Sequence, residues 1–553
     1  MDQVHGGEHV IDAARAAGVT TCFTLSGAHI FPVYDAAVGG KARVDAAADR
    51  QVAEKDGPLR LIDTRHEQTA AFAAEATGKL TRKPGFAAVT AGPGVTNSVS
   101  AITSAWFNGT PMVVLGGRSP DSRWGSGALQ ELDQPPILAP VTKGAWTTHD
   151  AGAIRADGDR AFALAASAHS GPVFWDIPMD VIFAPAPRAD LAVAAVDRGA
   201  EPDPESITTA RRLLDQATRP VLIIGSGVWM ADGVEAARAL VAARNLPVIS
   251  NGMGRGIVPP SDRHLVTRAR AAAFSGADLV IVVGTPLDFR LGYGVFGDPP
   301  ATVIHLVDAE SQRSSAGSVA CTVVGDLRWS IAALVDGAAS DDAWVASLRD
   351  TALAAVQADQ ANLTSTSPLI HPARIYGELL PRLTHDSVII GDGGDFVSFA
   401  GRYVEPALPG RWLDPGPYGC LGTGPGYALA AGIVHPQSPL FLLLGDGAAG
   451  FSLMDVDSLV RHRIPAVIIV GNNAGWALER GPMQLIYGYD VIADLAPTRY
   501  DEIAVALGGG GETVTDPAQI GPAIDRAMAS GITYLVNVMT DPDAAYPRST
   551  TGI

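Results

Sequence analysis

The sequence predicts an α/β protein made of three consecutive, doubly wound parallel-sheet domains. Short apolar runs alternate with alanine-rich stretches of helical length along the 553 residues, which is the pattern of repeated βαβ units. The apolar runs are nearly continuous, so the strands should be covered on both faces, as the strands of parallel sheets are. Two stretches with little periodicity separate three blocks, which we place at residues 1–182, 203–338 and 366–553.

The strands of each block can be placed in chain order. The first block has the strand-like runs TCFTL, LRLID, FAAVTAG, PMVVLGG and GPVFWDIP. The second has RPVLIIGSG, LPVISNGMGRG, ADLVIVVGTPLD and ATVIHLVDAE, and the third has DSVIIGDGG, PLFLLLGDG, PAVIIVGNN and ITYLVNVMTDP. Each run is followed by a loop or a helical stretch, so each block should form its own parallel sheet.

Composition excludes several classes of partner. The chain has 40 basic and 58 acidic residues, a formal charge of −18, which argues against a nucleic-acid surface or an anionic membrane. No apolar run is long enough to span a bilayer, and the first residues lack the form of a signal peptide. The three cysteines, Cys22, Cys321 and Cys420, have neither metal-ligand nor disulfide spacing, so we expect a reducing, cytoplasmic location.

The tripeptide Gly-Asp-Gly occurs twice, at 391–393 and 445–447, and each copy ends an apolar run. In open parallel sheets, ligands bind at the carboxyl ends of strands, where loops and helix N-termini present N–H groups. Asn473 follows the next apolar run, 27 residues after Asp446, which leaves room for a crossover helix. Asp446 and Asn473 should therefore emerge at adjacent strand ends and, with a backbone carbonyl, offer the oxygen ligands that Mg²⁺ prefers. The first copy has only Gly419 at the corresponding distance.

This succession of strand, Gly-Asp-Gly, helix, strand and Asn-Asn resembles the thiamine diphosphate signature of the decarboxylase and acetohydroxyacid synthase superfamily. The resemblance covers essentially the whole chain and implies thiamine diphosphate and Mg²⁺ as cofactors. It implies that Asp446, Asn473 and the carbonyl of Gly475 hold the metal. It also implies a wider set of cofactor-binding residues: Gly27, Glu67, Gly92, Asn97, Gly394, Asp395, Phe396, Gly419, Leu421, Asp446, Gly447, Ala448, Asn473, Gly475, Trp476 and Ala477.

Glu67 begins an alanine-rich stretch directly after the strand-like LRLID. Read alone, it is equally well explained as a solvated glutamate at a helix N-terminus. The following AAVTAGPGVTN has the order and spacing of the family's glutamate and Gly-Pro-Gly turn, which implies that Glu67 acts on the cofactor's pyrimidine ring. At N1′ a carboxylate favours the imino tautomer, whose N4′ removes the thiazolium C2 proton. The resemblance further implies that Glu67 and Asp446 of one site come from different subunits of a homodimer or homotetramer.

Four stretches point to the branch of the family that handles CoA thioesters: SGALQELDQ, DFVSFAGRY, GNNAGWALERGPMQ and the carboxyl-terminal run from LGGGGETV to DPDA. They resemble 2-hydroxyacyl-CoA lyases and oxalyl-CoA decarboxylases. The resemblance implies that Gln130 and Glu479 are catalytic polar groups. It also implies a set of substrate contacts: Leu129, Gln130, Arg402, Ala477 and Leu478. For Trp476 and Leu478, simple core packing remains open.

The leading hypothesis is therefore a lyase that cleaves a 2-hydroxyacyl-CoA to formyl-CoA and a ketone or aldehyde. Leu129 and Ala477 stand where oxalyl-CoA decarboxylases carry tyrosines, so we expect room for a branched substrate such as 2-hydroxyisobutyryl-CoA. Oxalyl-CoA decarboxylase is the first alternative and acetohydroxyacid synthase the second. A regulatory paralogue that binds the cofactor without chemistry is the non-enzyme alternative.

The middle block has weak signals for a nucleotide. Its glycine loops GSGVWM and GTPLDFRLGYG are common patterns when read alone, and a vestigial site is the competing interpretation. The family uses this domain for FAD in acetohydroxyacid synthases and for ADP in the oxalyl-CoA branch, so the CoA-type carboxyl end favours ADP. The residues that we expect around it are Arg160, Gly225, Asp288, Arg290 and Asp308.

Overall fold

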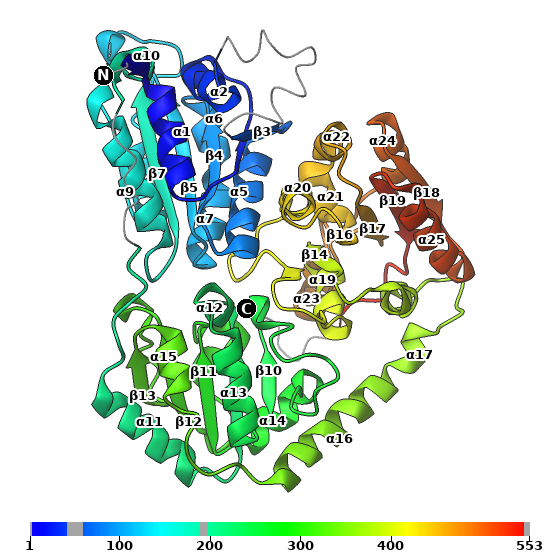
Figure 1. Cartoon of the computed structure of the whole chain (residues 1–553). Helices are drawn as coiled ribbons and strands as arrows, with labels where there is room; N and C mark the ends of the chain where they lie inside the picture. The colour runs from blue at the N-terminus through cyan, green and yellow to red at the C-terminus, as the bar shows by residue number, and fades with distance from the viewer. Residues whose placement is uncertain (1–2, 41–58, 189–195, 547–553) are drawn as a thin grey trace. The chain divides into compact units, whose positions relative to one another are not determined.

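The structure is a computed structural model that describes residues 3–40, 59–188 and 196–546. The chain forms two compact units, and each is described by itself. The first comprises Met1–Asp197, Pro415–Pro436 and Ser452–Ile464, and the second comprises Arg198–Asp414, Gln437–Phe451 and Pro465–Ile553. Three parallel sheets of five or six strands, flanked by helices, confirm the predicted α/β fold class (Figure 1).

The first sheet has the strand order β3-β2-β4-β5-β7-β6, with all pairs parallel. Its strands are β2 (Thr21–Thr24), β3 (Arg60–Asp63), β4 (Gly85–Val89), β5 (Met112–Arg118), β6 (Ala145–Thr147) and β7 (Pro172–Pro178). The helices that follow these strands include α2 (Phe31–Val38), α5 (Glu67–Thr81), α6 (Pro93–Asn97), α7 (Val99–Phe107) and α9 (Ile154–Ala166). A short antiparallel ribbon, β1 (Gln3–His5) with β8 (Pro185–Pro187), stands apart from this sheet.

Two helices that lie between strands of the third sheet in sequence belong to the first unit. They are α20 (Gly424–Val434) and α22 (Val456–Arg461), and α20 packs along α5. The close approach depends on Gly426, because a Cβ atom there would lie 2.8 Å from the carbonyl oxygen of Thr69. The contact is completed by a buried polar group, in which Tyr427 of α20 donates to Glu75 Oε2 (3.0 Å).

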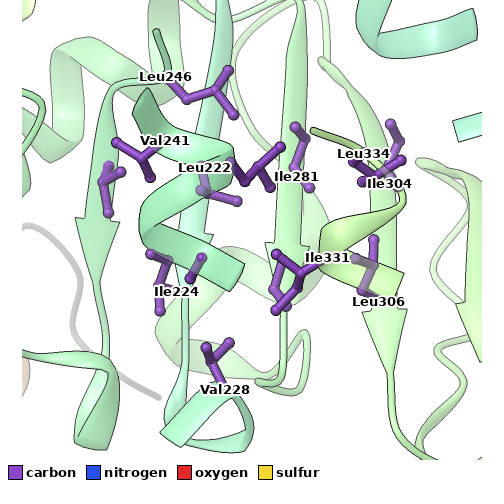
Figure 2. Packing of buried hydrophobic residues seen from close by; sticks show 14 of the residues in the cluster. Leu222, Ile224, Val228, Val241, Leu246, Ile281, Ile304, Leu306, Ile331 and Leu334 are labelled. Carbon is purple, nitrogen blue, oxygen red and sulfur yellow. The ribbon is translucent and has the colours of Figure 1, made fainter. Parts of the chain in front are cut away.

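The second sheet has the order β10-β9-β11-β12-β13 and is also parallel. Its strands are β9 (Pro220–Ile224), β10 (Val248–Ser250), β11 (Leu279–Val283), β12 (Thr302–Val307) and β13 (Val319–Val324). Leu222 and Ile224 face one core with α13 (Val234–Arg244) and α15 (Leu327–Ala332), as Figure 2 shows. The alternate residues Val221 and Ile223 face a second core. Both faces of β9 are therefore buried, which explains its continuous apolar run.

The third sheet has the order β15-β14-β16-β17-β19-β18, again parallel. Its strands are β14 (Val388–Asp392), β15 (Trp412–Leu413), β16 (Leu440–Gly445), β17 (Val467–Asn472), β18 (Gly510–Val514) and β19 (Tyr534–Met539). Helices of this unit include α18 (Pro372–Leu379), α19 (Asp395–Tyr403), α23 (Ala477–Tyr487), α24 (Tyr500–Ala506) and α25 (Ile520–Ser530). No helix among the described residues is both long and apolar enough to cross a membrane.

Each sheet reverses its winding direction between two adjacent strands. The chain leaves one strand of the pair toward one edge of the sheet and leaves the other strand toward the opposite edge. The pairs are β2 and β4 in the first sheet, β9 and β11 in the second, and β14 and β16 in the third. Ligands of open α/β sheets bind beyond the carboxyl ends of such pairs. Each of the three sheets therefore has one switch point at which a ligand could bind.

Candidate functional site

The two Gly-Asp-Gly copies end the two strands at the switch point of the third sheet. Asp392 is the last residue of β14 and pairs in register with Leu444 of β16, while Asp446 directly follows β16 and begins α21 (Asp446–Ser452). Gly445 pairs with Gly471 of β17, so Asp446 and the asparagines after Gly471 emerge at neighbouring strand ends. This is the arrangement that the spacing of the motif predicts.

The structure brings the three predicted metal-binding residues together. Asp446 Oδ2 accepts the Gly475 N–H at 3.1 Å, and Asn473 Oδ1 accepts the same N–H at 3.2 Å. Asp446 Oδ1 accepts the N–H of Gly447 at 2.9 Å. One carboxylate, one amide oxygen and an adjacent backbone carbonyl are a hard-oxygen set of the kind that binds Mg²⁺ together with phosphate and water.

The electrostatics of Asp446 fit a bound cation. The residue is 4% exposed, and burial raises the pKa of its carboxyl to about 6, opposed by the backbone N–H groups that donate to it. A buried carboxylate is costly to keep ionised unless a positive charge compensates it. Among the described residues, no group of three His, Cys, Asp or Glu side chains could hold a metal ion.

Several predicted cofactor residues pack tightly around this switch point. A Cβ atom on Gly447 would lie 2.4 Å from the Trp476 ring, and one on Gly394 would lie 2.2 Å from Leu478. Gly393 has a φ of +124° and approaches Gly445 and Ala448. The structure therefore joins the end of β14, the start of α21 and the start of α23 into one cluster.

Other predicted cofactor residues have structural partners. Phe396 of α19 is 6% exposed and packs on Gly471 of β17, so it fills core space between a helix and the sheet. Asp395 accepts the N–H of Tyr546 at 2.8 Å. In the first unit, Gly419 is exposed with a φ of +71°, and Leu421 is half-buried just before α20. Their contacts with a cofactor stay predictions.

The switch point of the first sheet holds the predicted acid–base residue. Glu67 is the first residue of α5, is 8% exposed, and accepts the Asn97 side-chain N–H at 3.1 Å through Oε2. Gly94 lies close by, since a Cβ there would be 3.6 Å from Glu67 Oε1. The structure thus assembles Glu67, Gly94 and Asn97, which the sequence placed in two separate motifs. A buried carboxylate that a neighbouring donor orients can exchange a proton with a ring nitrogen.

Glycines of the same switch point permit close loop contacts. A Cβ atom on Gly27 would lie 2.3 Å from Thr90, so the loops after β2 and β4 touch only because this residue is glycine. Gly92 has a φ of +60° and lies against Gln130, which itself has a φ of +61°. Gln130 is thereby placed beside the Gly-Pro-Gly turn.

Gln134 is a positioning residue that sequence reasoning missed. It is fully buried, accepts the Gly92 N–H through Oε1 at 2.7 Å, and donates to the Gly117 carbonyl at 3.0 Å. It also donates to Asp176 at 2.7 Å. It is the last residue of the stretch SGALQELDQ, but nothing in the sequence singles it out from its neighbours. It fixes the loop that carries Leu129 and Gln130.

The predicted substrate contacts are distributed over both units. In the first unit Leu129 is 78% exposed. In the second unit Ala477 is buried at the first position of α23, Leu478 contacts the Gly394 backbone region, and Glu479 is exposed. Arg402 makes a two-pronged ion pair with Asp359, with Nη2 to Oδ1 at 2.7 Å and Nε to Oδ2 at 3.2 Å. Its role toward CoA stays a prediction.

The predicted nucleotide residues fall in two units. In the middle sheet, Gly225 and Gly227 after β9 pack against Gly284 after β11, with added Cβ atoms at 2.6 and 2.7 Å from that residue. Asp288 pairs with Arg290 at 2.7 Å, and Asp308 directly follows β12. Arg160 belongs to the first unit, where its guanidinium lies 4.5 Å from the Trp146 ring centre.

Comparison with protein families gives three matches along the chain. Residues 4–137 match the N-terminal TPP binding domain of thiamine pyrophosphate enzymes, residues 207–334 their central domain, and residues 392–538 their C-terminal TPP binding domain. Thiamine pyrophosphate is thiamine diphosphate. Each matched segment falls on one of the three parallel sheets, although the first match ends before β6 and β7 of its sheet.

Curated relatives carry two different names. The chain is 45% identical over 551 residues to the acetolactate synthase large subunit IlvG of Mycobacterium tuberculosis, covering 99% of this chain and 97% of that protein. It is 33% identical to 2-hydroxyacyl-CoA lyase 2 of Caenorhabditis elegans, covering 93% of this chain and 85% of the relative. The human 2-hydroxyacyl-CoA lyase 2 is 32% identical, with 92% and 84% covered.

Proposed function

The chain belongs to the thiamine pyrophosphate enzyme family, and from this premise we propose that it cleaves a 2-hydroxyacyl-CoA to formyl-CoA and a ketone or aldehyde. The lyase relatives support this reaction class, although a more similar relative is called an acetolactate synthase. The proposal therefore depends on the chemistry of the residues beside the predicted metal site.

The apolar first turn of α23, which lies beside the predicted metal motif, is the main structural support for the proposal. Trp476 lies against Gly447 of the metal motif, and the two residues that follow it, Ala477 and Leu478, are apolar. The nearest basic residue in the helix, Arg480, already pairs with Asp494 at 2.8 Å. An apolar turn without a free cation disfavours a substrate carboxylate, whose desolvation would be costly. Oxalyl-CoA and pyruvate bring such a carboxylate, whereas a 2-hydroxyacyl thioester does not.

The residues present can perform the proton transfers of this reaction. When bound, thiamine diphosphate supplies a carbon nucleophile and an electron sink. Glu67, oriented by Asn97, holds and returns the proton at N1′ of the pyrimidine ring. In the net reaction the C1–C2 bond of the substrate breaks. The 2-hydroxyl loses its proton as the ketone or aldehyde leaves, and C1 takes a proton to become the formyl group of formyl-CoA. Gln130 and Glu479 remain the candidates for the substrate hydroxyl.

Product identity tests the proposal directly. The protein is incubated with Mg²⁺, thiamine diphosphate and a panel of 2-hydroxyacyl-CoA thioesters, and formyl-CoA is followed by mass spectrometry. We expect formyl-CoA and the matching carbonyl compound in equal amounts. If oxalyl-CoA gives formyl-CoA and CO₂ with a higher kcat/KM than every 2-hydroxyacyl-CoA, the lyase assignment is wrong.

Acetolactate synthase is the second candidate, and the 45% identity to a protein of that name favours it. The same preparation is therefore incubated with pyruvate alone. Formation of acetolactate and CO₂ faster than formyl-CoA from any thioester would replace the lyase by this synthase. If the protein binds the cofactor but converts neither CoA thioesters nor pyruvate, the result would favour a regulatory paralogue.

The size of residue 477 should control substrate shape. Replacing Ala477 by Tyr should reduce kcat/KM for branched 2-hydroxyisobutyryl-CoA more than for a linear substrate, because it removes the space for the second C2 substituent. Single methylene contacts are worth about 1–3 kcal/mol, so a change of about 10-fold in the branched-to-linear ratio is expected.

Two controls distinguish a change in the shape of the substrate site from a loss of stability or of cofactor binding. Ala477 is 7% exposed, so the melting temperature and cofactor affinity of the variant must be measured first. Leu129 is 78% exposed, and Leu129→Tyr therefore enlarges the other predicted wall residue without disturbing the core. A branched-to-linear ratio that stays unchanged in both variants would contradict the placement of these residues around the substrate.

We also propose ADP as the ligand of the middle domain, supported by Asp308 at the end of β12 and by the glycine loops at the β9–β11 switch point. A ligand that binds only the folded state raises its stability by mass action. ADP at 100 times its dissociation constant should therefore stabilise the protein by about 2.7 kcal/mol, seen as a higher Tm, whereas FAD should not. Stoichiometric flavin in the purified protein would contradict this assignment and favour the synthase.

We also propose that the protein forms a homo-oligomer. The end of α23 and the following loop expose large apolar side chains: Leu485, Ile486, Tyr487, Tyr489 and Ile492. Neighbouring exposed apolar groups are typical of surfaces that bind another protein, a membrane or a ligand, and we propose a second copy of this chain as the partner. Together with the family assignment, they support active sites that need a second subunit.

A further inference from the structure

A buried carboxylate of the first unit contacts the loop that carries Glu67. Asp455 ends the short helix η10 (Leu453–Asp455) and is 1% exposed. Its Oδ1 accepts the backbone N–H of Arg65 at 2.7 Å and the hydroxyl of Ser458 at 2.8 Å. Its Oδ2 accepts the hydroxyl of Thr69 at 2.7 Å. One side chain therefore takes three donors, two of them from the segment around Glu67.

Glu67 lies midway between the two fixed points. Arg65 precedes it by two residues and Thr69 follows it by two, in the first turn of α5. The direction of a side chain at the start of a helix follows the rotation of that first turn. A single carboxylate that fixes positions 65 and 69 therefore fixes how the Glu67 side chain leaves the helix.

Local capping does not account for these bonds. The N-cap of α5 is His66, whose Nδ1 accepts the Gln68 N–H at 3.1 Å without help from Asp455. The N–H of Arg65 lies outside the helix, so a helix cap does not need it. Burial raises the pKa of Asp455, and a buried carboxylate is retained at a cost that its hydrogen bonds must offset.

Residues that follow Asp455 in the sequence also contact the β3–α5 loop. Arg461 at the end of α22 pairs with Asp63 at 2.7 Å, and His462 also contacts the Asp63 carboxylate, at 3.0 Å. Asp457 lies 3.9 Å from the Arg65 guanidinium. These outer pairs are partly exposed and contribute little individually. They leave Asp455 as the buried member of the contact between this segment and the β3–α5 loop.

We propose that Asp455 is a positioning residue for Glu67, which holds the backbone on both sides of it so that its carboxylate keeps one direction. The inference rests on the proposed proton-transfer role of Glu67 and not on the identity of the substrate. A displacement of about 1 Å in such a group can cost ~10²-fold in rate. The predicted effect of losing Asp455 is therefore on proton transfer, with cofactor affinity much less changed.

The first measurement needs no cofactor. Amide hydrogen exchange of the peptide that contains Arg65 is compared in the cofactor-free wild type, Asp455→Ala and Asp455→Asn. Asp455→Ala removes an acceptor with full charge, so the Arg65 amide should exchange at least about 10-fold faster. Asp455→Asn can still accept from Arg65 and can donate to the Thr69 hydroxyl, so it should stay close to wild type. Equal exchange in all three proteins would overturn the contact itself.

The second measurement links the contact to Glu67. The rate of C2–H exchange of bound thiamine diphosphate, read by NMR after acid quench, should fall at least about 10-fold in Asp455→Ala and recover in Asp455→Asn. Tyr427→Phe is the matched control, because it removes a buried hydroxyl bonded to Glu75 on the same helix, two turns beyond Glu67. It should lower Tm while leaving C2–H exchange near wild type.

The possible outcomes distinguish a failure of the positioning role of Asp455 from a failure of the proton-transfer role of Glu67. If Glu67→Gln slows C2–H exchange but Asp455→Ala slows it no more than Tyr427→Phe, Asp455 is only structural and the inference fails. If Asp455→Asn is as slow as Asp455→Ala, hydrogen-bonded positioning is also wrong. If Asp455→Ala does not fold, Thr69→Val removes one of the two bonds and should slow exchange in the same direction. If Glu67→Gln itself exchanges normally, the proposed role of Glu67 fails instead.

Discussion

The Asp446→Ala variant should no longer retain thiamine diphosphate at micromolar concentrations. The substitution removes the only charged member of the predicted metal set, and Asn473 and the Gly475 carbonyl cannot replace its charge. Loss even of outer-sphere partners lowers metal affinity about 10–100-fold, so loss of this ligand should cost at least ~100-fold. Calorimetric titration with thiamine diphosphate at fixed Mg²⁺, and with Mg²⁺ at fixed cofactor, measures both affinities.

The other Gly-Asp-Gly copy provides the control. Asp392 ends the adjacent strand β14 and is fully buried, so Asp392→Asn, which keeps the shape of the side chain, is the matched substitution. It should weaken cofactor binding much less than Asp446→Asn, because no asparagine follows at the right distance to complete a metal set around it. Equal losses at both positions, in proteins with similar melting temperatures, would mean that the metal site is placed at the wrong copy.

Local sequence signals predicted the fold because the strands are buried on both faces. An element such as Pro220–Ile224 has only apolar residues, and both sets of alternate side chains lie in cores. The placement of Asp446 and Asn473 was predictable for a related reason. In a parallel sheet the register of two neighbouring strands determines which residues leave the sheet together, and the separation of 27 residues matches one crossover.

Contacts between distant segments could not be predicted in this way. The ion pair of Arg402 with Asp359, 43 residues earlier in the chain, had no signal in the sequence, and the contact of Arg402 with CoA stays a prediction. Gln134 and Asp455 were missed because a buried polar residue is recognised only by its partners, which lie 42 and 390 residues away. The packing of α20 on α5 was missed because it depends on which face of a helix is covered.

The role of the glycines in the middle domain also could not be decided from the sequence. Gly225, Gly227 and Gly284 belong to the two glycine loops that the sequence offered as a weak nucleotide signal, and the structure gives all three a packing reason, since the two loops touch each other there. Glycine at a switch point is compatible with a ligand and with close loop contact, and sequence alone does not separate the two. The ADP titration decides between them.

Glu67→Gln should leave the cofactor bound and reduce turnover by about 10²-fold or more. Glutamine keeps the shape of the side chain and can still contact Asn97, but it cannot exchange a proton at N1′. The C2–H exchange rate of bound thiamine diphosphate should fall with kcat, while the dissociation constant of the cofactor should change little. Normal C2–H exchange in this variant would remove Glu67 from the proposed mechanism.

Mixing the two disabled proteins tests where each residue acts. If one active site takes Glu67 from one subunit and Asp446 from another, a hybrid of Glu67→Gln and Asp446→Ala subunits contains one doubly altered site and one intact site. Refolding or subunit exchange of an equal mixture should then restore activity that neither parent has. If both residues of a site came from one chain, each site of the hybrid would carry one substitution, and the mixture would stay as inactive as its parents. Restored activity would support both the oligomeric site and the pairing of Glu67 with Asp446 in one reaction.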